Sequence, residues 1–381
     1  MKIFMRICLS LFVIFGVTAA SQAADATKII RADHYVRVTS TAPSMTGQTA
    51  LIYVREVAAG AALPAKSPNN RVVLFVHGAG TPAEVSFDVP YSDYSWMAYL
   101  AKAGFDVFSA DMTGYGRSTR PTVMNDPCNI QADFQKQFAP DLMPAPCAAP
   151  YTKPITTMGS DWDDISGVVD YLRALRGVDK VSLVGWSQGG PRTGGFAARH
   201  PEKVSRLVVL APAYGREGPL EAPNPLPTNT AGYTTVQTEA DFIANWDRQV
   251  GCPDQYEPTT KASVWAEMMA SDPVGATWGK GVRRAPQVPS WGFNKAVVEK
   301  MTVPFLMVTG VHDKQALPER VHELYADLGS RDKVLIDLAC SGHNAMWERN
   351  HLTLFQASLE WLDKGTYTGK TRGEFKAGAT K

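Results

Sequence analysis

The sequence lacks an excess of charge of either sign, a metal-binding cysteine motif and, after its first residues, any long hydrophobic run. Lysine and arginine together number 38, and aspartate and glutamate 37. This balance gives no electrostatic basis for binding nucleic acid or an anionic membrane. The cysteines form no C-x-x-C motif and have no histidine pair nearby, which argues against a zinc site. We therefore expect neither a metal nor another cofactor.

The first residues, 1–23, have the pattern of a secretory signal peptide. Lys2 and Arg6 supply a positive start, Ile7 to Val17 is apolar, and Ser21 to Ala23 offers small residues for cleavage. The apolar stretch is shorter than the roughly 20 residues that a membrane-spanning helix needs. We expect a periplasmic or secreted protein without a stable membrane anchor, the alternative being a retained anchor.

Four cysteines remain after removal of this segment, and they suggest two disulfides. They are Cys128, Cys147, Cys252 and Cys340. An even number in an exported protein favours disulfide bonds, and four cysteines allow three pairings. We expect Cys128 to pair with Cys147, since this closes a short loop, and Cys252 with Cys340.

Short apolar runs alternate with helical patterns along most of the chain. This alternation predicts an α/β fold with a mainly parallel, eight-stranded sheet and helices on both faces. The first two strands have no helix between them and predict an antiparallel hairpin at one edge. The expected strands are Tyr35–Val38, Ala50–Val54, Val72–Val76, Asp106–Ala110, Val181–Val184, Leu207–Leu210, Phe305–Thr309 and Val334–Leu338.

Two segments interrupt the alternation. Residues 119–158 are rich in proline and predict an ordered excursion, and residues 213–295 contain four tryptophans in loop- and helix-like surroundings. The second segment is well placed to cover a pocket at the strand ends. We expect residues 24–212 and 296–364 to form the core, 213–295 a cap, and the polar residues 365–381 a flexible tail.

A G-x-S-x-G pentapeptide, Gly185 to Gly189, follows the apolar run Val181–Val184 and leads into a helical pattern. Between a strand and a helix, this motif predicts a tight turn that exposes the oxygen of Ser187. A glycine-rich loop without chemistry is the alternative. A serine hydroxyl is a weak nucleophile near neutral pH, so Ser187 needs a base, and that base needs an acid to orient it.

Both partners are present in the expected chain order, each after a predicted strand. Asp313 follows Phe305–Thr309, and His343 follows Val334–Leu338 in a short loop. Ligands bind beyond the carboxyl ends of such strands. The sequence therefore predicts Ser187 as nucleophile, His343 as base and Asp313 as acid. Glu217 is the alternative acid, from the loop one strand earlier.

An acyl-transfer intermediate also needs hydrogen-bond donors for its negative oxygen. The backbone N–H of Gln188, directly after the serine, is one candidate. The loop His77 to Gly80 follows a strand and offers the N–H of Ala79 as the second. No lysine of a phosphate-binding loop follows these glycines, and we expect His77 itself to be structural.

Taken together, the motifs resemble the α/β-hydrolase superfamily, in its branch with a cap over the active site. The resemblance spans roughly residues 70–362 and rests on His77–Gly80, Asp111–Ser118, Gly185–Gly189, Gly310–Asp313 and Gly342–Asn344. It implies covalent catalysis, in which Ser187 attacks a carbonyl and His343 transfers the proton. Related enzymes with an aspartate nucleophile are disfavoured by the serine at 187.

The leading interpretation is an exported serine hydrolase acting on a small carboxylic ester or a lactone. The aromatic residues of the cap favour a substrate with an apolar or aromatic moiety. Alternatives with the same triad are an aminopeptidase or amidase, which needs cap carboxylates such as Glu239, Asp241, Asp247 or Glu267, and a C–C bond hydrolase. A non-catalytic binding protein on this fold is a further alternative.

Overall fold

A computed structural model of the chain describes residues 28–60, 63–138, 146–278 and 281–379. The expected signal peptide, residues 1–23, lies outside these ranges. Within them, a nine-stranded sheet has the order β1-β2-β4-β3-β5-β6-β9-β10-β11. Its strands are β1 (Ile29–Thr39), β2 (Thr49–Ala59), β3 (Val72–Val76), β4 (Asp106–Ala110), β5 (Val181–Trp186), β6 (Val204–Leu210), β9 (Phe305–Gly310), β10 (Lys333–Leu338) and β11 (Arg372–Ala377).

The sheet is parallel except at the edge that β1 forms. β1 pairs with β2, and β2 with β4, in the antiparallel sense, whereas all other neighbours are parallel. Every residue of β3, β4 and β5 is buried. Burial on both faces explains why these strands read as continuous apolar runs rather than alternating patterns. The predicted fold class and the predicted hairpin edge are confirmed.

Helices cover both faces of the sheet. One hydrophobic cluster holds Val72, Leu74 and Val76 of β3, together with side chains of α5 (Met158–Arg176), α6 (Gly189–Arg199) and α10 (Pro318–Asp327). The opposite cluster holds Val73 and Phe75, together with side chains of α3 (Trp96–Lys102) and α11 (His351–Lys364). Alternate residues of one strand therefore serve two separate cores.

The expected flexible tail, residues 365–381, is wrong for most of its length. Arg372 to Ala377 form β11, which pairs in parallel with β10 and makes the ninth strand of the sheet. The strand alternates between exposed and half-buried residues, so its polar composition suits a sheet edge. The rings of Tyr367 and Phe375 pack edge to face, 5.2 Å apart, beneath it.

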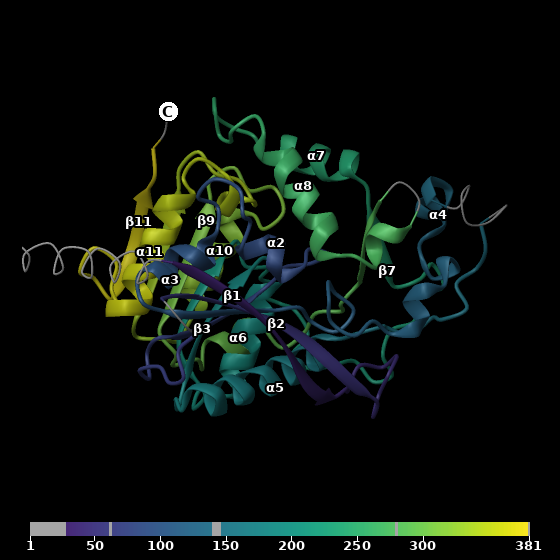
Figure 1. The fold of residues 1–381 in the computed structure, drawn as a ribbon, viewed down its shortest axis with the longest axis horizontal. Helices are drawn as coiled ribbons and strands as arrows, with labels where there is room; N and C mark the ends of the chain where they lie inside the picture. The colour runs from purple at the N-terminus through teal and green to yellow at the C-terminus, as the bar shows by residue number, and fades with distance from the viewer. Residues whose placement is uncertain (1–27, 61–62, 139–145, 279–280, 380–381) are drawn as a thin grey trace, which may run out of the picture.

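The segment between β6 and β9 carries a second, small sheet and several helices, and we call its residues 213–295 the cap segment. β7 (Thr234–Gln237) pairs with β8 (Arg283–Pro286) in the antiparallel sense. Between them lie α7 (Glu239–Asp247), α8 (Thr260–Ser271) and the short helix Gly275–Thr277, at the top of the view in Figure 1. The short helix α9 (Lys295–Val298) leads back to the main sheet.

The proline-rich excursion packs against the cap segment. It contains two 3-10 helices, Thr122–Asn125 and Pro127–Asn129, and the helix α4 (Ala132–Phe138). Ile130 makes a β-bridge with Thr234 and shares an apolar cluster with Val236, Trp278 and Val282. The two segments that interrupt the sequence pattern, residues 119–158 and the cap segment, are thus packed against each other.

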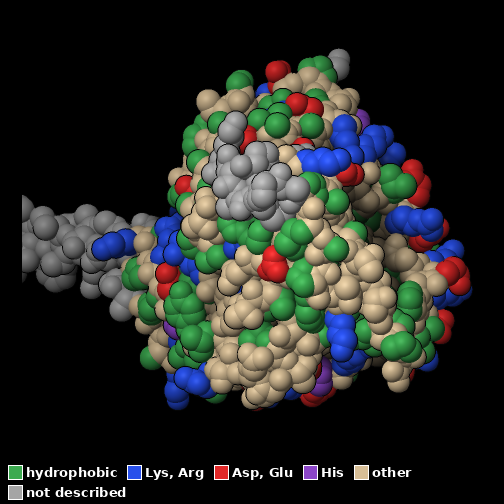
Figure 2. Space-filling view, turned by 90° about the vertical axis from the view of Figure 1, so that its right-hand side faces the viewer, with side chains coloured by type: hydrophobic (Ala, Val, Ile, Leu, Met, Phe, Trp, Pro, Cys, Tyr) green, Lys and Arg blue, Asp and Glu red, His purple; other side chains and the backbone are tan. Residues whose placement is uncertain are grey.

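The exterior is mixed in charge. On the face shown in Figure 2, basic and acidic side chains are interspersed along the right-hand margin. In the part of the chain that the structure describes, no helix is long and apolar enough to cross a bilayer.

Candidate active site

Ser187 lies on a strained turn between β5 and α6. Its φ is 56°, in the left-handed region that only a few non-glycine residues adopt. A Cβ on Gly185 would lie 2.4 Å from the carbonyl oxygen of Gly189, and one on Gly189 would lie 2.3 Å from that of Val76. Larger residues at these two positions would force β3, β5 and α6 apart. The glycines therefore permit the close packing that holds Ser187 in its turn.

Asp313 and His343 meet across the ends of the neighbouring strands β9 and β10. His343 Nδ1 lies 2.8 Å from Asp313 Oδ2, and both side chains are buried. The other oxygen, Oδ1, accepts hydrogen bonds from the amides of Gln315 (2.7 Å) and Ala316 (2.9 Å). Because a carboxylate only accepts, Nδ1 carries the proton and Nε2 is left as an acceptor.

The alternative acid lies elsewhere. Glu217 is exposed and lines a surface depression with Arg216 and Lys295. No hydrogen bond or ion pair joins it to His343 among the described residues. The structure thus places Asp313, and not Glu217, against the imidazole.

Ser187 and His343 line one small cavity of about 70 Å³ between the sheet and the cap segment. The structure records no hydrogen bond between these two described side chains. Such contacts are often long before substrate binds. The cavity wall also includes Ala79, Thr81, Trp186, Gln237, Phe242, Asn245, Arg283, Gln315, Asn344 and Trp347.

This wall differs from the aromatic lining expected from the cap tryptophans. Trp246 is fully buried against Trp347 and Phe242, and Trp265 and Trp278 also pack in apolar clusters. Trp291 lines a separate cavity of about 180 Å³. The cap tryptophans therefore stabilise the cap segment, and its residues on the wall of the Ser187 cavity are Gln237, Phe242, Asn245 and Arg283.

Two backbone N–H groups point to an anion site beside the serine. Within the described ranges, no hydrogen bond is recorded from the amide of Ala79 or from that of Gln188. A Cβ on Gly78 would lie only 2.9 Å from Ser187 Cβ, so glycine allows the loop to approach the serine. Unpartnered amides at a serine turn are suited to a developing negative oxygen.

The family model described as the alpha/beta hydrolase fold matches residues 71–350. The chain belongs to the α/β-hydrolase fold family. The match spans the strands β3 to β10, the cap segment, Ser187, Asp313 and His343, whereas β1, β2 and β11 lie outside it.

Solved structures share the fold of this α/β hydrolase at low sequence identity. A serine hydrolase involved in carbazole degradation has a TM-score of 0.50 and 19% identity, over 86% of this chain and 98% of that one. An esterase from Exiguobacterium antarcticum has a TM-score of 0.51 and 14% identity, over 87% and 99%. Naproxen esterase from Bacillus subtilis has a TM-score of 0.50 and 14% identity, over 94% and 100%.

One curated relative matches over a short stretch. Forty-six residues are 50% identical to part of the poly(3-hydroxyalkanoate) polymerase subunit PhaC of Allochromatium vinosum. This stretch is 12% of the present chain and 13% of that protein. It is too short to relate the two proteins as wholes.

Arg192, on the helix that follows Ser187, fixes the Ala79 loop of this α/β hydrolase. Its Nη1 donates to the carbonyl oxygens of His77 (2.9 Å) and Gly78 (3.0 Å), and its Nε donates to Asp161 (2.6 Å). Arg192 and Asp161 are both fully buried. No sequence motif indicates this arginine, because its partners lie more than 30 residues away.

His77 is structural, as expected. Its Nε2 accepts from the amide of Met112 (3.0 Å), so Nδ1 carries the proton and donates to the oxygen of Gly78 (2.8 Å). Burial, and then the charge of Arg192, lower the pKa of His77 well below its usual value. A neutral imidazole therefore supports the loop.

Gln249 of the cap segment holds the loops of His343 and Asp313 together. Its Oε1 accepts from the amide of His343 (3.1 Å) and from that of Lys314 (3.3 Å), and its side chain is buried. A glutamine 94 positions before His343 carries no sequence signal. The cap segment thus contacts the loops that carry Asp313 and His343, in addition to lining the cavity.

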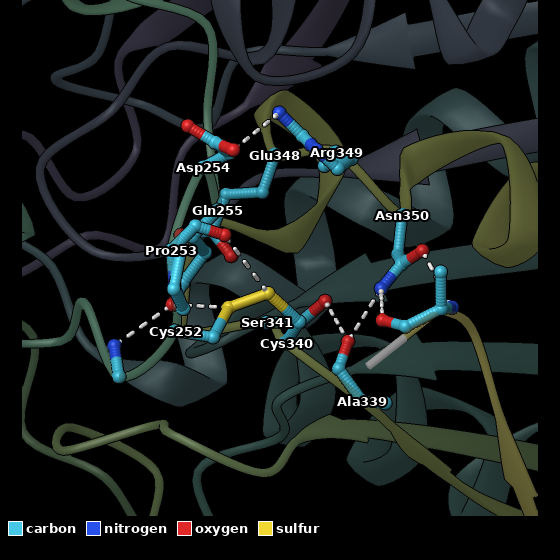
Figure 3. Close-up of a disulfide and its surroundings, with 12 residues drawn as sticks. Cys252, Pro253, Asp254, Gln255, Ala339, Cys340, Ser341, Glu348, Arg349 and Asn350 are labelled. Atoms are coloured by element: carbon cyan, nitrogen blue, oxygen red, sulfur yellow. Dashed lines mark hydrogen bonds and ion pairs between the residues drawn. A yellow bond between two sulfur atoms is a disulfide. The ribbon is translucent and has the colours of Figure 1, made fainter. Parts of the chain in front are cut away.

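Two disulfides have the pairing expected from the sequence. Cys128 joins Cys147, and Cys252 joins Cys340, with Cα–Cα distances of 5.3 and 5.6 Å. The second bond ties the cap segment to the loop that leads to His343. Figure 3 shows it between the turn Cys252–Gln255 and Ala339–Ser341, with Glu348 nearby.

The two disulfides should differ in their effect on stability. The bond Cys252–Cys340 closes a segment of 88 residues, and Cys128–Cys147 one of 19 residues. The loss of chain entropy in the unfolded state grows with loop length, so the stabilisation is about 4.5 kcal/mol for the longer loop and about 3 kcal/mol for the shorter one. We expect the pair Cys252→Ala and Cys340→Ala to lower the free energy of unfolding more than the pair Cys128→Ala and Cys147→Ala. Urea unfolding of both double variants measures this, and an equal or reversed order would contradict it.

Glu348 lies beneath the His343 loop, and among the described residues it has no positively charged partner. Its carboxyl oxygens accept from the amide of Gly342 (2.6 Å) and from Trp246 Nε1 (3.0 Å). Burial raises the pKa of Glu348 from 4.5 to about 7. Near neutral pH this carboxyl group therefore exchanges a proton while connecting the His343 loop to the cap segment.

This raised pKa predicts a pH dependence of stability. Between about pH 4.5 and 7, the folded protein keeps the Glu348 proton that the unfolded chain has lost. The contribution of this group to the free energy of unfolding is therefore at its maximum below pH 4.5 and decreases as the pH rises to 7. We expect Glu348→Gln to be less stable than the native protein at pH 5. Its free energy of unfolding should fall less steeply with pH, by up to about 1.4 kcal/mol per pH unit. Urea unfolding at pH 5, 6, 7 and 8 would detect it, and parallel slopes would refute it.

Proposed function

We propose that this protein is an exported serine hydrolase that cleaves carboxylic esters. The observation that carries the proposal is the buried hydrogen bond between His343 and Asp313, on the wall of the cavity that also contains Ser187. The bond leaves Nε2 of His343 as a proton acceptor on the side away from Asp313. The strained turn at Ser187 and the unpartnered amides of Ala79 and Gln188 support the same chemistry.

In the proposed reaction, Ser187 Oγ attacks the ester carbonyl carbon while His343 Nε2 accepts the hydroxyl proton. The carbonyl oxygen becomes an anion and receives hydrogen bonds from the amides of Ala79 and Gln188. The C–O bond then breaks, and His343 returns its proton to the leaving alcohol. A water molecule, deprotonated by His343, releases the acid from Ser187 by the same steps. Asp313 keeps the imidazole oriented and stabilises its positive form.

The polar wall of the cavity favours ester over aminopeptidase chemistry. Asp241 caps α7 through Thr238, and Asp247 pairs with Lys261. No aspartate or glutamate is among the described residues that line the cavity, so a substrate amine has no acidic partner there. Phe242, Trp186 and Trp347 offer an apolar wall to the rest of the substrate. They support the expected preference for an apolar or aromatic moiety.

Export is supported by two features. Disulfides form and persist in oxidising compartments, and two join the cysteines that follow the signal-like segment. The proposal expects a periplasmic or secreted protein whose mature chain begins at Ala24. N-terminal sequencing of the protein from its native cells tests this, and an uncleaved, cytoplasmic chain would refute it.

A fluorophosphonate probe tests the mechanism directly. Such probes react with an activated serine, so we expect a single covalent adduct on the peptide that contains Ser187. Turnover of a panel of short esters and of amino-acid anilides then separates ester from amide cleavage. Absence of the adduct from the folded protein would reject the serine mechanism, and turnover of anilides alone would reject the ester proposal.

A further inference from the structure

Arg283 is a cation on the wall of the Ser187 cavity without an acidic partner. It lies on β8, at the edge of the cap segment, and its two terminal nitrogens donate to Thr81 Oγ1 and to Gln237 Oε1. A guanidinium has five N–H donors, so three remain after these two bonds. In the described part of the chain, no carboxylate lies within ion-pairing distance of it.

Other buried arginines are used differently. Arg120, Arg176 and Arg192 each pair with a buried carboxylate. Arg284 has no acidic pair, but its donors bond to the carbonyl oxygens of Met124 and Val274, and its guanidinium stacks on Trp278 at 3.9 Å. Arg283 differs from all four, since it lines the same cavity as the candidate nucleophile Ser187.

The loop of Ala79 places Arg283 close to the serine. A Cβ on Gly80 would lie 3.2 Å from Arg283 Cζ, and one on Gly78 would lie 2.9 Å from Ser187 Cβ. Two residues of chain span at most about 7 Å. The guanidinium and the serine therefore lie at the two ends of one short loop, and one small molecule can reach both.

Arg283 gives the cavity a positive charge, and no aspartate or glutamate is among the described residues that line it. Burial lowers the pKa of Arg283 to about 10, which leaves it protonated at neutral pH. The other polar side chains of the wall include the neutral amides Gln237, Asn245, Gln315 and Asn344. A partly buried charge is costly unless it is paired, and no carboxylate is among the described residues that line the cavity, so Arg283 is available to pair with a carboxylate of a ligand.

We propose that Arg283 binds a carboxylate of the substrate, so that the preferred esters are short and carry one free carboxyl group. This inference rests on the proposed function and names its substrate class. A planar carboxylate matches the guanidinium fork, and the cavity of about 70 Å³ suits a short molecule. The carboxylate belongs either to the acyl part or to the alcohol part of the ester.

Two matched pairs of esters test the inference and distinguish these cases. Monoethyl succinate is compared with ethyl 4-oxopentanoate, in which a methyl ketone replaces the carboxylate on the acyl side. Acetoxyacetate is compared with acetoxyacetone for the alcohol side. We expect kcat/KM to favour the charged member of at least one pair by about 10- to 100-fold, the value of a charge-assisted hydrogen bond. Equal values in both pairs would overturn the inference.

Variants connect the preference to the residue. Arg283→Gln should lower the charged-to-neutral ratio of kcat/KM by about 10- to 100-fold, while Arg283→Lys should keep part of it. Succinate should inhibit the native protein competitively, and Arg283→Gln much more weakly. Arg248→Gln is the matched control, because Arg248 is an exposed arginine of the same cap segment. An unchanged ratio in a folded Arg283→Gln protein would overturn the assignment.

The two proposals fail in different ways. If the fluorophosphonate labels Ser187 and esters are hydrolysed without regard to charge, only the role of Arg283 is rejected. If Ser187 is not labelled and none of the four esters is hydrolysed, the proposed function itself is rejected, and with it the inference. Thermal unfolding of each variant separates loss of recognition from loss of fold.

Discussion

Replacing Ser187 with alanine is expected to lower kcat for ester hydrolysis by at least about 10⁴-fold, because Ser187 carries the nucleophile of the proposed reaction. The other hydroxyl among the described residues of the cavity wall, that of Thr81, accepts a hydrogen bond from Arg283. The fold should persist, since the Ser187 side chain makes no hydrogen bond in the described structure. Removal of its oxygen also leaves the backbone bond from its amide to the oxygen of Leu210, at 2.9 Å, in place. Initial rates over a range of substrate concentrations, with thermal unfolding in parallel, measure both effects.

A second serine provides the control. Ser290 lies near the site, where its Oγ is 3.4 Å from Gln188 Nε2, and it is exposed. Ser290→Ala removes the same atom from the same neighbourhood, so kcat should change less than about threefold, as for an ordinary surface substitution. Fluorophosphonate labelling should disappear in Ser187→Ala and remain in Ser290→Ala. Residual turnover in Ser187→Ala within tenfold of the native rate would show that another nucleophile acts.

The central strands were predictable because their burial leaves a direct record in the sequence. The bounds of β3 and β4 agree with the apolar runs expected for Val72–Val76 and Asp106–Ala110. The site residues Ser187, Asp313 and His343 follow such strands closely, so their approach to one another was predictable from the strand order alone. The apolar runs that mark the strands therefore also indicate where the site residues lie.

Edge strands and distant contacts leave a weaker record. β11 is polar because only one of its sides is covered, and its sequence resembles that of a loose terminus. Arg192 and Gln249 act through side-chain hydrogen bonds to partners that include residues 115 and 94 positions away. No spacing rule connects such pairs, because they meet only after the sheet has formed.

The cap segment shows why composition is a poor guide to a pocket. Its tryptophans suggested an aromatic lining, but burial of large apolar side chains is what stabilises a packed segment. Trp246 and Trp265 extend the apolar cluster on one face of the main sheet, and Trp278 packs in a small cluster of its own. Residues of β7 and α7, and Arg283 of β8, are left to face Ser187, so the more polar part of the cap segment forms the wall.

Asp313→Asn is expected to lower kcat by about 10⁴-fold with little change in overall structure, as the corresponding change does in a serine protease. The amides of Gln315 and Ala316 both donate to Oδ1, at 2.7 and 2.9 Å, and will retain the oxygen of the new side-chain amide. Its NH₂ group must then face His343 Nδ1, which can accept only if it is unprotonated. The imidazole proton moves to Nε2, the atom that has to receive the proton of Ser187.

Glu217→Gln is the matched control for this substitution, because it makes the same change at the alternative acid. Glu217 is exposed and has no recorded bond to His343, so kcat should stay within about threefold of the native value. Steady-state kinetics of the two variants on one ester provides the comparison. If Glu217→Gln lost more activity than Asp313→Asn, the acid would have to come from the earlier loop through a rearrangement of the cap segment. If Asp313→Asn alone is inactive, the tautomer of His343, fixed by one carboxylate oxygen, decides whether Ser187 can react.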